Sequence, residues 1–147
     1  MSTAADPGPA PVTGGCFCGR VRYEFRAAPL AQSLCHCRSC RRACGASPVA
    51  WLVLPTAGLR FVAGRPSRHR SSPGVERGFC RACGTPLTYR VLADPDTIDL
   101  TLCSLDEPAR FAPTREVWVE HRLPWAAPAA GRPRFARGSA DGPPLDG

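Results

Sequence analysis

Hydrophobic and polar residues alternate with a period of two in short runs of this chain. In the segment 20–26, Val21, Tyr23 and Phe25 alternate with polar residues. Such alternation puts one row of side chains on each face of an extended segment and predicts a half-buried β-strand. Further runs with strand character, alternating or short and apolar, are 49–54, 59–62, 87–91, 98–103 and 116–121. Short strands joined by turns predict an all-β fold.

Prolines interrupt the sequence throughout, with 17 Pro and 14 Gly among 147 residues. Because proline lacks a backbone donor and clashes with the preceding turn, a helix of ordinary length has almost no place to form. Residues 1–11 and 132–147 are rich in Pro and Gly and lack a strand pattern, so we expect flexible tails there. The interval 12–131 is predicted to be one compact domain without an internal linker.

The charge balance is basic, and all 19 cationic side chains other than histidine are arginine, which gives a formal net charge of +7. Such a balance favours an anionic partner, either nucleic acid or a small molecule. No apolar run is long enough for a transmembrane helix, and we expect no membrane association. The first 15 residues contain neither a basic residue nor an apolar block, so we expect no secretory signal. A cytoplasmic, reducing location follows, where disulfides are disfavoured.

Seven of the nine cysteines fall into three closely spaced groups: Cys16 and Cys18; Cys35, Cys37 and Cys40; Cys80 and Cys83. Cys16 and Cys18 share one face of an extended segment, whereas a C-x-x-C turn brings Cys80 and Cys83 to one side, with Gly84 relieving the tight backbone. Each pair supplies half of a tetrahedral thiolate site, and the two pairs together predict a structural zinc. Unmetallated core cysteines and an iron–sulfur cluster are the less favoured alternatives.

The middle group, Cys35, Cys37 and Cys40, differs because it has three cysteines. Three protein ligands with one open position are typical of a reactive zinc site. Cys44 follows four residues after Cys40 and would close the site if it also bound the metal. The site is flanked by three arginines that could bind substrate carboxylates or form a solvated basic turn: Arg38, Arg41 and Arg42.

Three motifs occur in order along the chain: Gly15-Cys16-x-Cys18-Gly19-x-Val21-x-Tyr23, Cys35-His36-Cys37-x-x-Cys40-Arg41-Arg42, and Arg77-Gly78-Phe79-Cys80-x-x-Cys83-Gly84-Thr85-x-Leu87. Together with Leu105-Asp106 and Arg122-Leu123-Pro124-Trp125, they resemble the glutathione-dependent formaldehyde-activating enzyme (GFA) / centromere protein V family. The likeness runs from about Gly14 to Trp125.

This resemblance implies a β-tent fold of small antiparallel sheets with zinc knuckles and two Zn²⁺ per chain, the second of them labile. It implies that a structural zinc is held by Cys16, Cys18, Cys80 and Cys83. It also implies that a catalytic-type zinc is held by Cys35, Cys37 and Cys40. The implied activity is that of a carbon–sulfur lyase which forms or cleaves a thiol–aldehyde adduct such as S-hydroxymethylglutathione. Family members often have a histidine where this chain has Glu116, and the position of Cys44 is usually small and non-ligating.

Two classes of function therefore compete. The first is the lyase-like enzyme, whose partners would be a small thiol such as glutathione and an aldehyde. The alternative is a non-catalytic zinc module that contacts nucleic acid or a protein through a second basic stretch, Arg65, Arg68, His69, Arg70, Arg77 and Arg81. Because aromatic residues make up 7% and most occupy strand-core positions, base stacking is poorly supported and we expect no nucleic-acid partner.

Three further expectations concern other residues. We expect His36, between two ligands, to face away from them as a hydrogen-bonding or surface residue. Cys44 and Cys103 could serve in redox or metal handling, although inert thiols are the more usual outcome. One cluster of acidic residues is expected to form a solvated turn region: Asp94, Asp96, Asp99, Asp106 and Glu107.

Overall fold

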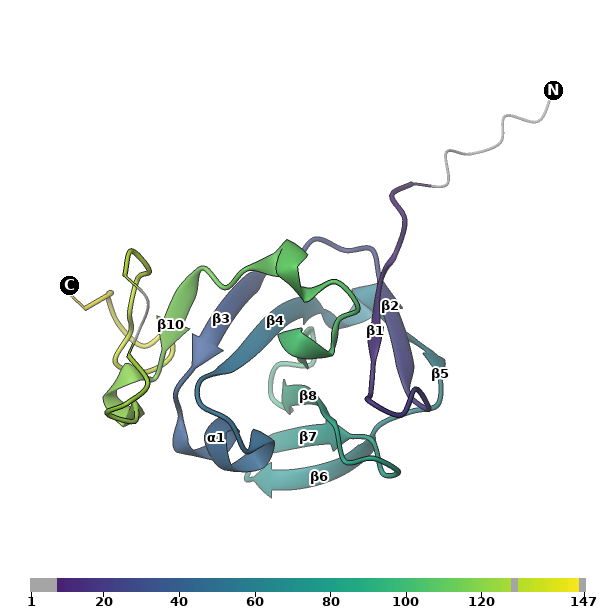
Figure 1. Cartoon of the computed structure of the whole chain (residues 1–147), viewed down its shortest axis with the longest axis horizontal. Coiled ribbons are helices and arrows are strands. Elements are labelled where there is room, and N and C mark those ends of the chain that lie inside the picture. Colours follow the sequence, from purple (N-terminus) through teal and green to yellow (C-terminus); the bar gives the residue numbers. More distant parts are fainter. Residues whose placement is uncertain (1–7, 128–129, 146–147) are drawn as a thin grey trace.

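The computed structural model describes residues 8–127 and 130–145, in which ten strands form two sheets (Figure 1). The three-stranded sheet has the order β1-β2-β5, with β1 (Val12–Gly15), β2 (Arg22–Phe25) and β5 (Leu59–Ala63). The seven-stranded sheet has the order β10-β3-β4-β9-β8-β7-β6, with β10 (Arg115–Val117), β3 (Ala31–Cys35), β4 (Val49–Pro55), β9 (Thr97–Thr101), β8 (Pro86–Val91), β7 (Val75–Phe79) and β6 (Ser67–Ser72). The all-β prediction is confirmed, and the pairing is antiparallel except between β10 and β3.

Strand β4 explains how one sheet supports two separate apolar clusters. Leu52 and Leu54 are fully buried against the three-stranded sheet, in the main core with Tyr23 and Phe25 of β2. Trp51, on the opposite face, packs in a second cluster with the middle cysteine group. A strand covered on both faces must be apolar at successive positions, which is why the segment 49–54 reads as a continuous run and not as an alternation.

The second cluster lies on one face of the seven-stranded sheet, and the strand register shows which residues share that face. Residues directly opposite each other in paired strands point to the same side of a sheet. Cys35 lies opposite both Val49 and Val117, and Trp51 lies opposite Ser33 and Thr101. The same face continues across β9, β8 and β7 through Asp99, Tyr89 and Arg77. Chemically diverse residues are thereby gathered on one surface of the sheet.

The structure also contains elements that the hydrophobic pattern did not predict. A short helix, α1 (Arg38–Cys44), begins after Cys37 and ends at Gly45, whose φ of 63° provides a left-handed cap. The prolines indeed leave no room for a longer helix, but this interval of seven residues is free of them. Strands β1, β3, β6 and β7 were not predicted either, because β6 and β7 are polar and the other two are short.

Two predicted strands are shorter than the pattern indicated. The run 98–103 ends as a strand at Thr101 and continues as a 3-10 turn, Leu102–Ser104. The run 116–121 ends as a strand at Val117, because Trp118 adopts a left-handed conformation with φ of 58°. Alternation alone cannot detect a backbone reversal of this kind, which the tertiary contacts of the strand impose.

The segment that follows Gly131 runs beside β10, whereas its composition suggested a flexible tail. The Glu116 N–H donates to the Pro133 carbonyl at 3.0 Å, and the Glu116 carbonyl accepts from the Phe135 N–H at 2.9 Å. The Trp118 N–H donates to the Arg137 carbonyl at 2.9 Å. These backbone hydrogen bonds give β10 a second neighbour and hold Trp118 in its unusual conformation.

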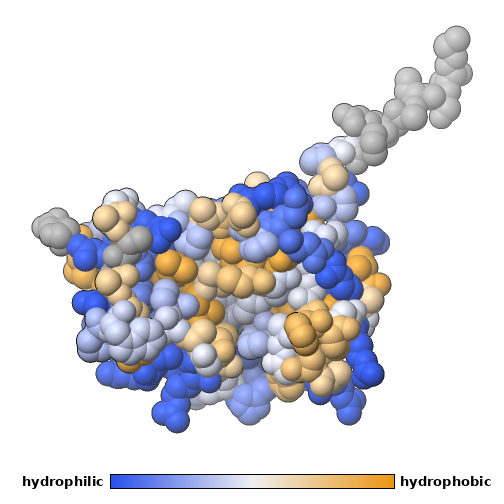
Figure 2. Space-filling view, viewed as in Figure 1, coloured by the Kyte–Doolittle hydropathy of each residue, from blue (hydrophilic) through white to orange (hydrophobic). Residues whose placement is uncertain are grey.

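The opposite edge of the seven-stranded sheet is formed by β6, most of which is exposed. Figure 2 shows hydrophilic side chains gathered along the edge where Figure 1 places β6. Exposed arginines are a common way to keep an edge strand from pairing with another chain. None of the helices in the described ranges has the length and apolar character that a membrane crossing requires.

Candidate metal centres

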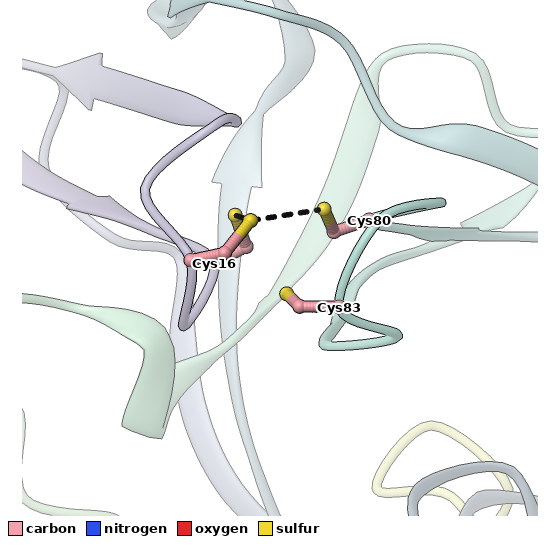
Figure 3. A group of neighbouring side chains, drawn as sticks. Cys16, Cys80 and Cys83 are labelled. Carbon is pink, nitrogen blue, oxygen red and sulfur yellow. Dashed lines mark hydrogen bonds between the residues drawn. The ribbon is translucent and has the colours of Figure 1, made fainter.

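Four cysteines from two turns meet between the sheets. Cys16 and Cys18 lie in the loop between β1 and β2, and Cys80 and Cys83 lie in the loop between β7 and β8. Their four sulfur atoms all lie within 4.8 Å of one another. Figure 3 shows the side chains of Cys16, Cys80 and Cys83 turned toward one another from these two loops.

Both turns hold their cysteines by a similar set of backbone contacts. The Gly84 N–H donates to the Cys80 carbonyl at 2.7 Å, and the Gly19 N–H donates to the Cys16 carbonyl at 3.1 Å. Each glycine has a φ of 80°, a conformation that residues with a Cβ rarely adopt. The Phe17 N–H donates to Thr85 Oγ1 at 3.1 Å and ties the first turn to the second.

The spacing of these sulfurs fits a tetrahedral metal ion. A tetrahedron with metal–sulfur bonds of ~2.3 Å has sulfur–sulfur edges of about 3.8 Å. The Cys16–Cys18 and Cys18–Cys80 sulfurs lie 3.6 and 3.8 Å apart. Hydrogen bonding from Thr85 lowers the pKa of the Cys83 thiol to about 5, so that thiolate is available to a cation. The four cysteines can therefore hold a metal ion.

The middle cysteine group is assembled by a strand end and a helix start. Cys35 is the last residue of β3, Cys37 caps α1, and Cys40 lies in the first turn of that helix. The Cys37 sulfur accepts from the Cys40 N–H at 3.2 Å. The three sulfurs lie within 4.8 Å of one another, so this cluster can also hold a metal ion.

Mutual contacts move the pKa values of these thiols in opposite directions. Hydrogen bonds with Cys35 and Cys40 lower the pKa of Cys37, whereas hydrogen bonds with Cys37 and Cys40 raise the pKa of Cys35. The three thiols cannot all ionise at such close range without a compensating positive charge. A bound cation supplies that charge, which is why the donor set suits a metal ion.

Cys44 lies outside the group of mutually close sulfurs. Its side chain packs against the second apolar cluster, and burial raises the pKa of its thiol to about 11. Cys103, at the other position considered for redox chemistry, is exposed. The geometry therefore leaves three sulfurs in the middle cluster, with no fourth cysteine beside them in the described ranges.

The middle cluster opens onto a cavity of about 460 Å³, whereas the four-cysteine cluster does not line it. Aromatic side chains of the sheet and of the β10 region form much of the wall, and Trp51 and Tyr89 lie with their ring centroids 6.0 Å apart. The cavity contains polar and charged groups as well: Ser33, Arg38, Ser39, Ser72, Arg77, Asp99 and His121. A small molecule in this cavity would therefore meet sulfur, aromatic rings and charges of both signs.

The three arginines that flank the cluster in the sequence are separated by the helix. Arg38 lines the cavity beside the cysteines. Arg42 lines a second cavity of about 420 Å³, on the Cys44 side of the helix. Arg41 is not among the residues that line either cavity, and its Nε is buried without a hydrogen-bond partner among the described residues.

The structure brings a fourth arginine to the cysteines, which the sequence had placed in the third motif and in the second basic stretch but not at this cluster. Arg77 of β7 donates from Nη2 to the Cys40 sulfur at 3.6 Å and from Nε to Ser71 Oγ at 3.1 Å. Its guanidinium carbon lies 4.9 Å from the centroid of the Tyr89 ring. Only sheet pairing brings β7 to this cluster, so local sequence offered no signal for the contact.

His36 is buried, so the surface alternative for this residue is wrong and the hydrogen-bonding alternative is confirmed. Its Nε2 lies 2.8 Å from Glu116 Oε1, and both side chains are at most 1% exposed. Glu116, which stands where the family often has histidine, therefore links β10 to the turn that carries Cys35 and Cys37. His36 is not part of the cluster of mutually close sulfurs.

Of the five acidic residues expected in a solvated turn region, Asp99 has other surroundings, whereas Asp106 is exposed but makes defined contacts. Asp99 points into the cavity from β9. Asp106 forms a salt bridge with Arg22 and accepts a hydrogen bond from Thr13 Oγ1 at 2.6 Å, so it joins the end of the β9 region to the three-stranded sheet. A hydrogen bond from Arg22 lowers the pKa of Asp106.

Comparison with known proteins agrees with this geometry. The sequence profile of the family described as "Glutathione-dependent formaldehyde-activating enzyme" (GFA) matches residues 11–121. Among solved structures, a crystal structure of a Rhodobacter sphaeroides protein has a similar fold, with a TM-score of 0.54 and 23% identity over 64% of this chain and 87% of that one. Because the profile spans both cysteine clusters and most of both sheets, the chain belongs to the glutathione-dependent formaldehyde-activating enzyme family.

Proposed function

We propose that this protein forms or cleaves a thiol–aldehyde adduct, such as S-hydroxymethylglutathione, in the cavity beside Cys35, Cys37 and Cys40. Two Zn²⁺ ions per chain belong to this proposal, one in each cluster. The four-cysteine site would be structural, because it has a full set of ligands and lies away from the cavity. The observation that carries the proposal is that the three-sulfur cluster opens onto a cavity of about 460 Å³.

Zinc is the metal that suits both clusters best. Thiolate sulfurs favour zinc and other soft ions, and zinc accepts either four protein ligands or three with an open position. When bound beside Cys35, Cys37 and Cys40, zinc would lower the pKa of a fourth, substrate thiol and keep its sulfur nucleophilic at neutral pH.

The chain's own residues would bind and orient the substrates. Glutathione has two carboxylates, and Arg38 and Arg77 are the cations in the cavity wall that could pair with them. Arg77 is already oriented by Ser71 and by the Tyr89 ring, so little side-chain entropy would be lost on binding. Aromatic rings line part of the cavity, and an aldehyde held against the sulfur reacts as if both belonged to one molecule.

A direct test measures adduct formation from glutathione and ¹³C-labelled formaldehyde by NMR, with increasing protein concentration. We expect the rate of adduct formation to rise in proportion to the concentration of wild-type protein. Cys40→Ser removes one ligand of the middle cluster and should abolish the acceleration together with one equivalent of bound metal. Cys103→Ser is the matched control, because Cys103 is exposed and lies outside both clusters.

The Cys44→Ser variant tests whether Cys44 is a fourth ligand that closes the metal site of the middle cluster. With only three ligating cysteines in the middle cluster, this variant should keep two metal equivalents and the wild-type rate. Loss of the second metal in Cys44→Ser would contradict the open site. A rate equal to the uncatalysed one at every concentration of metal-loaded wild-type protein would exclude the lyase-like function itself.

The alternative function, a module that contacts nucleic acid, would have to use the exposed arginines of β6. Arg68 and Arg70 lie on this edge strand, and Arg68 is paired with Glu76 at 3.7 Å. A nucleic-acid-binding role gives no reason for the cavity beside the middle cysteine cluster. A mobility shift with nucleic acid at low salt that vanishes in an Arg68→Ala/Arg70→Ala variant would favour it over the enzyme.

A further inference from the structure

Asp99 is the one carboxylic acid side chain in the wall of the cavity, among the described residues that line it. Its register on β9 sets it opposite Val53 of β4 and opposite Tyr89 of β8, so it shares the face of the sheet that carries Cys35 and Trp51. No salt bridge or hydrogen bond within residues 8–127 and 130–145 uses its carboxyl group. Arg77 of β7 acts on this carboxyl group electrostatically but forms no salt bridge with it.

The surroundings of Asp99 favour the protonated acid. Burial is the main cause that raises its pKa to about 7, with a further rise from Asp94 in the turn before β9 and an opposing effect from Arg77 of β7. Tyr89 is the titratable group facing it from β8, and β4 contributes no charged side chain. A carboxyl group that gains and loses a proton near neutral pH is suited to proton transfer.

We propose that Asp99 is the general acid and base of this cavity. As the thiolate sulfur bonds to the carbonyl carbon of the aldehyde, the electron pair of the C=O π bond moves to oxygen, and the Asp99 carboxyl donates its proton to that oxygen. In the reverse direction the Asp99 carboxylate takes the hydroxyl proton, the C=O bond forms again and the carbon–sulfur bond breaks. The open cavity lets water restore the proton, and no redox partner is needed.

This inference rests on the proposed function and adds a catalytic residue to it. General acid–base catalysis usually contributes a factor of about 10² to 10⁴ in rate, because the group must be correctly placed and protonated. The cysteines and arginines of the cavity cannot supply this proton, because thiolates and guanidinium groups in those roles remain ionised.

The experiment compares wild type, Asp99→Asn and Asp99→Glu, each with its metal content measured, over a range of pH. In the wild type we expect kcat/KM for adduct formation to fall as pH rises through about 7. Asp99→Asn should lower kcat/KM by about 100-fold and remove that decline. Asp99→Glu keeps a carboxyl group and should recover part of the rate. Asp96→Asn, in the exposed turn before β9, is the matched control and should behave as wild type.

A second readout does not depend on turnover. In ¹³C NMR of the aspartate carboxyl groups, one resonance should titrate near pH 7 in the wild type and be missing in Asp99→Asn. If Asp99→Asn keeps the wild-type rate and pH profile while the wild type accelerates the reaction, the role of Asp99 is refuted and the proposed function stands. If the resonance titrates at ordinary acidic pH, the role is also refuted. If the metal-loaded wild type gives no acceleration, the proposed function fails and the role of Asp99 fails with it.

Discussion

At the scale of single residues, the surroundings of Asp99 change the pH at which its carboxyl group loses a proton. Asp99 occupies a strand position between Ile98 and Leu100, both of which are buried on the opposite side in the main core. Alternation assigns Asp99 to the other face, but only the second apolar cluster makes that face a partly enclosed one. The same aspartate on a solvated sheet face would titrate at its usual pH.

The raised pKa of Asp99 predicts how stability depends on pH. An aspartate normally has a pKa near 3.9, so between about pH 4 and pH 7 the folded protein keeps a proton that the unfolded chain has lost. Ionisable Asp99 therefore makes folding less favourable as pH rises through this window. Relative to wild type, the unfolding free energy of Asp99→Asn should increase by on the order of 3 kcal/mol from pH 4 to pH 8.

Denaturant unfolding at several pH values measures this difference. Asp96→Asn serves as the control, and its difference from wild type should change little over the same range. If the difference in unfolding free energy between Asp99→Asn and wild type does not change with pH over this range, Asp99 titrates as an exposed aspartate.

At the scale of elements, β10 connects the middle cysteine cluster to the C-terminal segment. It pairs in parallel with β3, and its Glu116 side chain reaches His36 immediately after that strand. Trp118, just beyond β10, lines the cavity and stacks on His121 with ring centroids 5.3 Å apart. A short strand thus contributes both to the support of the cysteines and to the wall of the cavity.

The buried contact between β10 and the turn that follows β3 can be tested against an exposed one. Glu116→Ala leaves His36 Nε2 buried without its partner, so we expect a loss of about 1–3 kcal/mol in unfolding free energy. Glu120→Ala removes a partly exposed contact to Arg137 Nε at 2.9 Å, where we expect less than about 1 kcal/mol. Thermal and denaturant unfolding compare the two variants. Equal losses would contradict the assignment of the Glu116–His36 contact as a structural link.

At the scale of the whole molecule, the four-cysteine cluster joins the two sheets. The β1–β2 loop belongs to the three-stranded sheet and the β7–β8 loop belongs to the seven-stranded sheet, and they are separated by more than 60 residues in the chain. A metal ion at this junction would close a long loop and replace part of the apolar core that a small domain lacks.

Removing a metal ion from the four-cysteine cluster should unfold the protein, whereas removing one from the middle cluster should not. Structural zinc sites contribute on the order of 10 kcal/mol to folding. Cys83→Ser should therefore lower the melting temperature sharply, whereas Cys40→Ser should lose one metal equivalent and stay folded. Metal analysis and thermal unfolding, with and without a mild chelator, measure both effects. Similar melting temperatures for Cys83→Ser and Cys103→Ser would exclude a structural metal at the junction.

Much of the fold and the membership of each cysteine group could be predicted from the sequence, because strand alternation and ligand spacing within a turn are local features. The joining of two distant pairs into one cluster was expected because a tetrahedral thiolate site needs four ligands. Strand β2 is evident from the alternation of Tyr23 and Phe25 with polar residues, and β4 from its continuous apolar run. The helix α1 was missed because its seven residues depend on a cap from Cys37 and on the left-handed Gly45, not on an apolar stripe.

The sequence by itself determined which residues can bind a metal, because ligand spacing within a turn fixes which sulfurs point together. The tertiary structure decided which residues accompany those sulfurs. Arg77, Tyr89 and Asp99 come from three different strands and reach the middle cluster only through the order β9-β8-β7. Sheet order is set by the packing of the whole core, and no local pattern encodes it. The set of charged and aromatic groups in the cavity therefore follows from the pairing of distant strands.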